Sequence, residues 1–198
     1  MLFRSIFSVV NAVLLRPLPY IQPQRLVRVY TEFVNFPGGG LGRFWTSPPE
    51  YLDLRRETKS WESLDAWVNG GASIAGIAEP VRVTGSFVTG GLLKSLGVPP
   101  FMGRAISSED DDPKSALVAD ISYGVWQRVF GRDPRIVGRE TMLNGQKCTI
   151  IGVMPKGFAF PPGEVDPPEI WTPCSLIQPS QVDAARIIFI CWAASSLM

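Results

Sequence analysis

The residue types that most often carry enzyme chemistry are scarce or badly spaced in this sequence. It contains no histidine, so the commonest general base and the commonest zinc ligand are both missing. Mechanisms built on Ser-His-Asp, Cys-His or HExxH arrangements are therefore excluded. The three cysteines, Cys148, Cys174 and Cys191, are too far apart for a CxxC zinc or redox motif. We expect buried free thiols, although one disulfide between any two of them stays open in an oxidising compartment.

Carboxylates gather at two places in the sequence. Residues 109–112 form an acidic run, and hard cations bind several carboxylate oxygens. The run lacks the spacing of an EF-hand loop, so we favour a solvated turn before Pro113 over a cation site. A pair suited to glycoside hydrolysis is conceivable in the second group, but its aromatic neighbours favour an amphipathic helix with a charged outer face. That group consists of Asp53, Glu57, Glu62 and Asp65.

The stretch GGGLG, residues 38–42, superficially resembles a loop that cradles phosphate. Neither the Lys-Ser/Thr of a Walker A motif nor a strand leading directly into a helix accompanies it, so we expect a flexible loop at a domain tip. Phe36, Phe44 and Trp45 flank this loop. Such aromatic residues either form an exposed binding patch or belong to the core, and we favour the core. No site residue for catalysis, a cofactor or a metal is assigned.

Composition favours a small globular unit without a strong electric field. The 198 residues are 45% apolar and 19% charged, which suits one domain or two small subdomains. The formal net charge of +1 gives no overall field to attract nucleic acid or an acidic membrane. We therefore expect no nucleic-acid partner.

The first half of the chain is predicted to combine strands with short helices. Alternating apolar residues predict a half-buried strand over 26–32, and Ser47 before Pro48 predicts the start of a helix. The spacing of the aromatic and leucine residues in 61–68 predicts another helix. Residues 72–77 and 81–88 alternate as two strands of a hairpin.

The second half continues the alternation. Helices are predicted over 89–96, ended by Gly97, and over 122–130, with Ser122 as its cap. Asn144-Gly145 is a strong hairpin signal between the strands 141–143 and 147–153. A short strand over 117–119 and an edge strand over 169–171 complete the set. The Gly-Arg pairs at 42–43, 103–104, 131–132 and 138–139 are expected to be turns with solvated arginines.

This order of elements indicates an α+β fold built on β-α-β units.

Both ends of the chain are apolar. Residues 1–15 are shorter than the roughly 20 residues of a spanning helix, and Arg16-Pro17 stands where a secretory signal would be cleaved. We expect the outer end of a membrane helix, with Tyr20 at the interface, and a cleaved signal is the alternative. Residues 187–198 are expected to be a buried strand or an accident of the chain end rather than a membrane span.

Several blocks resemble the MacB-like periplasmic core domain of ABC transporter permeases, especially the acidobacterial type of the MacB/FtsX permease family. These blocks are residues 6–20, 25–27, 47–54, 83–104 and 122–161, the last carrying DPRIVG, the Asn-Gly hairpin and GVMPKGFAFP. The similarity fades after Pro173, and Gly91 stands where the family usually has an aromatic residue, which is expected to loosen the helix there.

The resemblance implies an organisation in three parts. Residues 1–20 would be the end of a membrane helix or an anchor, 21–175 the core domain and 176–198 an unmatched apolar tail. The core would hold a split β-α-β, ferredoxin-like subdomain beside a mostly β subdomain.

The resemblance also implies a non-catalytic role and a place for the domain. The domain would lie on the periplasmic side of the inner membrane and couple ATP-driven motion of membrane helices to export. Its partners would be a cytoplasmic ABC ATPase, reached through membrane helices that this chain lacks, a second permease copy and a periplasmic adaptor. A stand-alone secreted or periplasmic binding domain, or a non-functional permease fragment, is the alternative.

Overall fold

The fold is described from a computed structural model of the chain, which describes residues 20–35, 37–44, 46–59, 61–76, 79–174 and 188–193. The expected membrane segment therefore lies outside the described residues, except for Tyr20, and so do Phe36 and Trp45. Within the described residues, no helix is long and apolar enough to cross a membrane.

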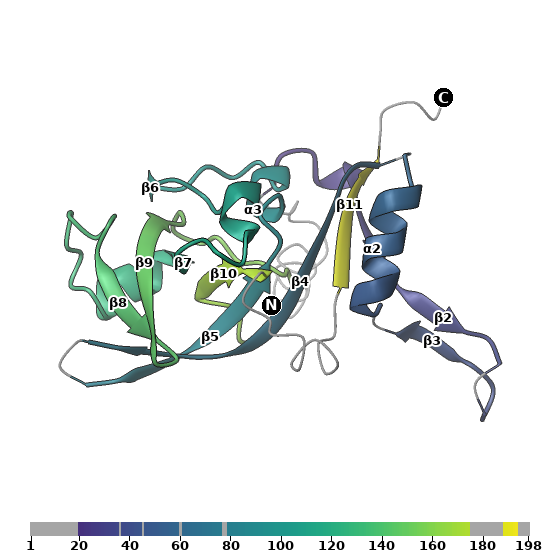
Figure 1. The fold of residues 1–198 in the computed structure, drawn as a ribbon, viewed down its shortest axis with the longest axis horizontal. Coiled ribbons are helices and arrows are strands. Elements are labelled where there is room, and N and C mark those ends of the chain that lie inside the picture. Colours follow the sequence, from purple (N-terminus) through teal and green to yellow (C-terminus); the bar gives the residue numbers. More distant parts are fainter. Residues whose placement is uncertain are drawn as a thin grey trace, which may run out of the picture.

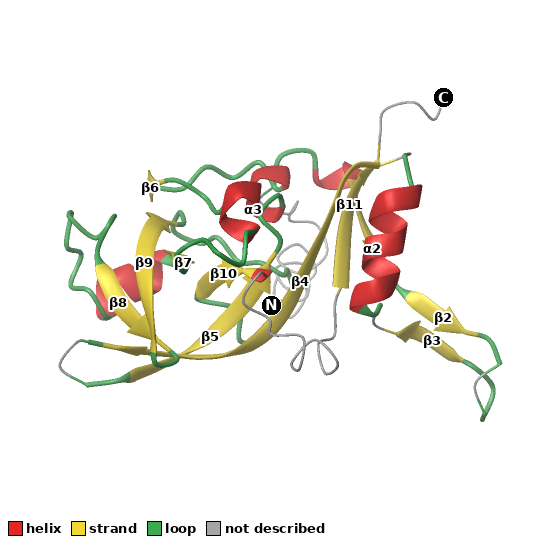
Figure 2. Ribbon diagram, viewed as in Figure 1, coloured by secondary structure: helices red, strands yellow, loops and turns green. Residues whose placement is uncertain are grey.

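A large mixed sheet organises the described part of the chain (Figures 1 and 2). Its strands follow the order β1-β11-β4-β5-β10-β7-β9-β6, with β8 paired to both β4 and β9. The strands are β1 (Leu26–Val29), β4 (Trp61–Ala75), β5 (Val81–Val88), β6 (Met102–Gly103), β7 (Val118–Ile121), β8 (Glu140–Leu143), β9 (Gln146–Val153), β10 (Ile170–Pro173) and β11 (Ile188–Ala193). A separate hairpin pairs β2 (Thr31–Phe33) with β3 (Leu41–Phe44).

The helices are short. They are α2 (Pro48–Glu57), α3 (Leu92–Ser95) and α4 (Tyr123–Arg128), with the 3-10 turns η1 (Pro23–Arg25) and η2 (Ser108–Asp111). The α+β class is therefore confirmed. The parallel strands β7 and β9 are connected through α4, which makes one β-α-β unit. The division into a ferredoxin-like part and a mostly β part stays a prediction.

The helix predicted over 61–68 is wrong, because these residues begin the long strand β4. Leu64 and Ala66 pack against Tyr51 of α2, whereas Trp67 belongs to the large core on the other face. Both faces of the strand are thus covered, and the buried residues run consecutively from Leu64 to Trp67. A strand buried on both faces loses the alternation by which a strand is recognised in sequence.

The predicted local signals at helix ends and turns are confirmed. Ser47 caps α2 in a capping box, in which the Glu50 carboxylate accepts a hydrogen bond from the Ser47 N–H at 2.7 Å. Ser122 caps α4 by accepting the Val125 N–H at 3.1 Å. Asn144 and Gly145 both have positive φ angles, 50° and 81°, as a tight hairpin turn of the primed type requires.

Two strand predictions need correction. The strand expected over 26–32 is interrupted at Tyr30, so β1 pairs with β11 whereas β2 turns away to pair with β3. The edge strand expected over 169–171 is β10, which lies between β5 and β7 with all four residues buried. Residues 188–193 of the apolar tail form β11, which pairs with β1 and β4 of the main sheet.

Alternate side chains of β10 show how the two faces of the sheet are filled. Trp171 packs into one cluster with α3 and Phe160, and Ile170 packs into the other with α4. Tyr20 belongs to the first cluster: it is buried, its hydroxyl donates to the Ala159 carbonyl at 2.6 Å, and its ring lies edge-on to Phe160. The expected place of Tyr20 at a membrane interface is therefore wrong.

The segment 101–112 crosses the end of the sheet and contacts it closely at Gly152. A Cβ atom at Gly152 would lie 2.4 Å from both the Arg104 carbonyl oxygen and a carboxylate oxygen of Asp120. Replacement Gly152→Ala should therefore lower the free energy of unfolding by about 1–3 kcal/mol, because backbone must move to relieve the overlap. Chemical denaturation monitored by tryptophan fluorescence measures this loss.

The matched control is Gly71→Ala in β4, where a Cβ would meet no atom within 4 Å. This variant should keep the free energy of unfolding to within about 0.5 kcal/mol. Equal stability of the two variants would contradict the close packing at Gly152.

Candidate interaction surfaces

The acidic run at 109–112 is not simply a solvated turn, because two of its carboxylates are at least partly buried and hydrogen-bonded. Asp110 is buried and receives two hydrogen bonds from the Arg104 guanidinium, at 2.7 and 2.8 Å. Asp111 accepts the Gly90 N–H at 2.8 Å, and Asp112 accepts the Lys114 N–H. Among the described residues, no group of three His, Cys, Asp or Glu side chains is placed to hold a metal ion. The run instead fastens the segment 101–112 to the domain.

Asp120 provides another attachment for this segment, and sequence analysis missed it. Its carboxylate is fully buried in β7 and accepts the Ile106 N–H at 2.8 Å through Oδ2. Oδ1 has no hydrogen-bond partner and lies beside the Arg104 carbonyl oxygen, across from Gly152. An unpaired buried carboxylate oxygen disfavours the charged form. A lone acid within the apolar run LVADI was the available sequence signal.

The neighbouring carboxylates titrate in opposite directions. Burial raises the pKa of Asp120 to about 7, against smaller lowering effects from the Ile106 N–H and the Arg104 charge. The hydrogen bond from Arg104 lowers the pKa of Asp110 to about 2. Burial raises the pKa of Asp111, because the hydrogen bond from the Gly90 N–H offsets only part of the desolvation.

Two of the Gly-Arg pairs are more than turns. Gly103 and Gly138 have positive φ angles, as expected of turns, but their arginines are not simply solvated. Arg104 binds Asp110, and Arg139 lies 3.5 Å from the Asp133 carboxylate with its guanidinium over the Phe130 ring.

The four carboxylates weighed for glycoside hydrolysis do not form a catalytic pair. Asp53 and Glu57 both contact Arg56 on the exposed face of α2, and Glu62 pairs with Arg25 at 2.6 Å. Asp65 is buried on β4, where it accepts hydrogen bonds from the Thr89 and Ser95 hydroxyls at 2.9 and 2.8 Å.

Asp65 also corrects the expectation about Gly91. A Cβ at Gly91 would lie 2.5 Å from Oδ1 of Asp65, so the buried carboxylate occupies the space that a larger residue would need. The short helix α3 follows Gly91, and the hydroxyl of its residue Ser95 donates a hydrogen bond to the Asp65 carboxylate. Leu92 and Leu93 of the same helix are buried. The packing around Gly91 is therefore close, because the Asp65 carboxylate lies directly against this glycine.

Cys148 and Cys174 are free thiols, as expected, and neither is activated. Burial raises the pKa of each thiol to about 12, with an added contribution from the Asp111 charge at Cys174. Cys148 is fully buried, and Cys174 is half-buried. The side chain of Cys191 lies outside the described residues.

The hairpin β2–β3 projects from the sheet (Figure 1) and exposes apolar side chains. Phe33 and Phe44 are 42% and 36% exposed and meet edge-to-face with ring centroids 5.6 Å apart. The core placement expected for Phe44 is therefore wrong. Glycines 38–40 at the tip all have positive φ angles, which supports the expected tip loop.

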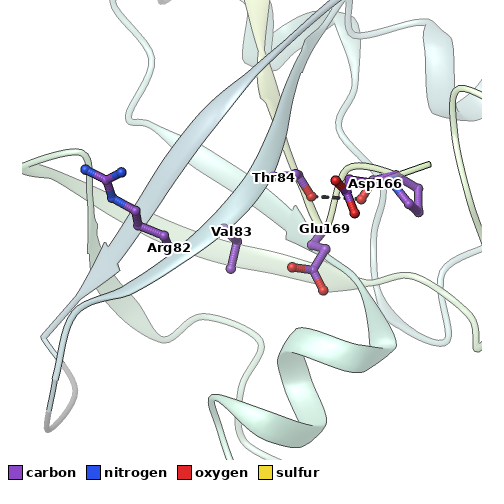
Figure 3. Close-up of a pocket in the computed structure, with 6 residues that line it drawn as sticks. Arg82, Val83, Thr84, Asp166 and Glu169 are labelled. Atoms are coloured by element: carbon purple, nitrogen blue, oxygen red, sulfur yellow. Dashed lines mark hydrogen bonds between the residues drawn. The ribbon is translucent and has the colours of Figure 1, made fainter. Parts of the chain in front are cut away.

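A shallow pocket of about 490 Å³ opens beside the first half of β5 (Figure 3). It is lined by Arg82, Val83, Thr84, Asp166, Pro167 and Glu169. The Thr84 hydroxyl donates to the Pro167 carbonyl at 2.8 Å, and Glu169 is bound by both terminal nitrogens of Arg128. Sequence analysis assigned no role to this place, although Pro167-Pro168 marks the point where a strand ladder must stop.

Comparison with known proteins gives a family match over most of the chain. The sequence model described as the MacB-like periplasmic core domain matches residues 2–192. No curated protein sequence matches the chain.

Solved structures with low sequence identity share the fold. The extracellular domain of the ABC-type transporter YknZ from Gram-positive bacteria is 14% identical with a TM-score of 0.60, covering 86% of this chain and 83% of that one. The periplasmic region of MacB from Actinobacillus actinomycetemcomitans is 11% identical with a TM-score of 0.63, covering 88% and 77%. A domain of a putative permease from Porphyromonas gingivalis is 11% identical with a TM-score of 0.65, covering 90% and 79%.

The raised pKa of Asp120 predicts a specific pH dependence of stability. Between pH 3.8, the ordinary value, and about 7, the folded chain holds a proton that the unfolded chain releases. The free energy of unfolding should therefore fall as pH rises through this window, by at most about 1.4 kcal/mol per pH unit from this group. Asp120→Asn keeps an acceptor for the Ile106 N–H and cannot ionise, so it should remove this component.

Urea denaturation of both proteins at pH 5 and pH 8 measures the effect. The free energy of unfolding gained by Asp120→Asn over the unsubstituted protein should be larger at pH 8 than at pH 5. A difference between the two proteins that is the same at both pH values would show that Asp120 does not titrate there.

Proposed function

The chain belongs to the family of MacB-like periplasmic core domains of ABC transporter permeases, and from this premise we propose that it transmits the ATP-driven motion of membrane helices to partners outside the membrane. The chain is a transporter domain of the extracytoplasmic side. Its role in this proposal is mechanical, and the chemistry of ATP hydrolysis belongs to a separate cytoplasmic ABC ATPase.

The construction of β4 is the observation that supports this role best. This strand of 15 residues pairs with β11 and β5 and, near its end, with β8. Figure 1 shows it running from the side of α2 and β11 to the side of β8. A continuous hydrogen-bonded strand that is buried over Leu64–Trp67 resists bending there, so displacement at one end would be carried toward the other.

The arrangement of the sheet also supports attachment to membrane helices at one edge. Residues 1–20, which we propose to be the end of a membrane helix, lead through Tyr20 and η1 into β1. The next strand, β11, is the last one described and pairs with β1 over four residues. The connection from residues 1–20 would then reach the sheet beside the paired strands β1 and β11, and motion would enter the domain at the β1–β11 edge.

The proposal includes an inner-membrane location and three partners. They are the ABC ATPase, a second copy of the permease and a periplasmic adaptor, of which the last two would contact the domain directly. The exposed hairpin β2–β3 offers apolar area for such a contact, because Phe33, Val34 and Phe44 lie open to solvent.

Membrane attachment is tested by comparing the full chain with a version that lacks residues 1–19 and so keeps the buried Tyr20, each carrying the same C-terminal tag. The full chain should remain in the membrane fraction after alkaline washing, and the shortened chain should be released. Protease added to spheroplasts should digest the domain of the full chain, because it faces outward.

If the expressed full chain is instead recovered as a processed soluble protein that starts after Tyr20, the tether is contradicted and a stand-alone binding domain is favoured. Purification of the tagged full chain from native membranes should also retrieve an ABC ATPase, and deletion of residues 1–19 should abolish that retrieval. A preparation without any ATPase would favour a fragment that serves no transporter.

A further inference from the structure

We propose that the open edge of β5 at Arg82 binds an extended segment of a partner polypeptide by strand addition, with a basic residue of that segment facing Asp166. The inference does not depend on the transporter role, because it rests only on the backbone of β5 and the pocket beside it. Main-chain hydrogen bonds would supply the affinity, and the acidic wall would supply the preference for charge.

The direction of the backbone groups of β5 follows from four hydrogen bonds. The Thr89 N–H, just after β5, donates to the Ala66 carbonyl of β4. The backbone N–H and C=O groups of odd-numbered residues in β5 therefore point toward β4. The Thr84 carbonyl accepts the Glu169 N–H, so even-numbered residues face away from β4. Ser73, which lies opposite Arg82, accordingly turns its N–H and C=O toward Asn144 and not toward β5. The N–H and C=O of Arg82 therefore point outward along the edge.

The chain leaves this part of the edge uncovered for a chemical reason. Strand β10 pairs with β5 only from Gly85 onward. Before β10, Glu169 still donates its N–H to the Thr84 carbonyl, but the residues preceding Glu169 are Pro167 and Pro168, which lack the N–H groups needed to extend the ladder toward Arg82. Upstream of the prolines the chain turns outward, and Val165 is 94% exposed. The pocket of about 490 Å³ is the space between this departing loop and the edge of β5.

The walls of the pocket favour a basic side chain. Figure 3 shows Asp166 and Glu169 near one another, whereas the Arg82 side chain points away from them. Glu169 is already bound by Arg128. Asp166 is exposed and makes no side-chain ion pair or hydrogen bond among the described residues, so it is the acid open to a partner. Val83, which forms part of the pocket, is buried against the core and fixes the position of the edge.

Strand addition makes a prediction that a surface ion pair alone does not make. The probe is a capped pentapeptide, Thr-Val-Lys-Val-Thr, titrated into the full chain while NMR follows exchange of the Arg82 amide proton. Saturating peptide should slow this exchange at least about tenfold, because the N–H becomes a ladder donor. The same peptide with N-methylated amides should not slow it, and a peptide with Glu in place of Lys should bind more weakly.

Two variants at one position separate the backbone from the side chain. Arg82→Pro removes only an N–H that β4 does not use, so it should abolish peptide binding and keep the thermal unfolding midpoint within a few degrees. Arg82→Ala keeps the N–H and should retain binding. Asp166→Asn should weaken the Lys peptide about two- to fivefold, the scale of an exposed ion pair. Unchanged exchange at Arg82 with every peptide, or full binding by a folded Arg82→Pro variant, would overturn the proposal.

Discussion

The pairing of β4 with β5 is the interaction on which the rest of the structure depends. Eight residue pairs, from Trp67 opposite Val88 to Ile74 opposite Val81, set the register of both strands. That register sends Trp67 into the main core, and it brings Asp65 to the hydroxyl of Thr89. A slip by one residue would exchange the faces of the strand and bury its polar side. The partners of β4 on its other edge, β11 and β8, depend on the same alignment.

The buried carboxylates of this domain have a structural role: they hold segments of the chain in place. Asp65 and Asp120 accept hydrogen bonds that connect segments far apart in the chain, whereas Asp110 accepts hydrogen bonds from Arg104 within its own segment. The segment 101–112 has little regular structure, and these bonds position it across the end of the sheet. A buried charge without its partner is costly, so such contacts specify one arrangement of the loop more strongly than apolar packing does. Asp110 and Asp120, whose pKa values are shifted in opposite directions, make the stability of the domain sensitive to pH.

Local chemistry explains which elements were predictable. The cap at Ser47, the cap at Ser122 and the turn at Asn144-Gly145 depend on atoms within a few residues, so the sequence alone indicated them correctly. The start of β4 was mistaken for a helix because its covering by α2 on one face and by the core on the other depends on distant segments. The interior position of β10 was missed for the same reason, since its neighbours β5 and β7 lie far away in sequence.

The sequence by itself determined the fold class, the helix ends, the hairpin turn and the resemblance of ordered blocks to a transporter domain family. It also determined the absence of histidine and hence of the commonest catalytic arrangements. Only the tertiary structure decided which acids are buried and which backbone edge stays open. The acidic run at 109–112 became an attachment because Arg104 and Gly90 approach it, and β5 kept an open edge because Pro167 directs the chain away. Burial and strand pairing are properties of contacts between distant residues, which no local pattern encodes.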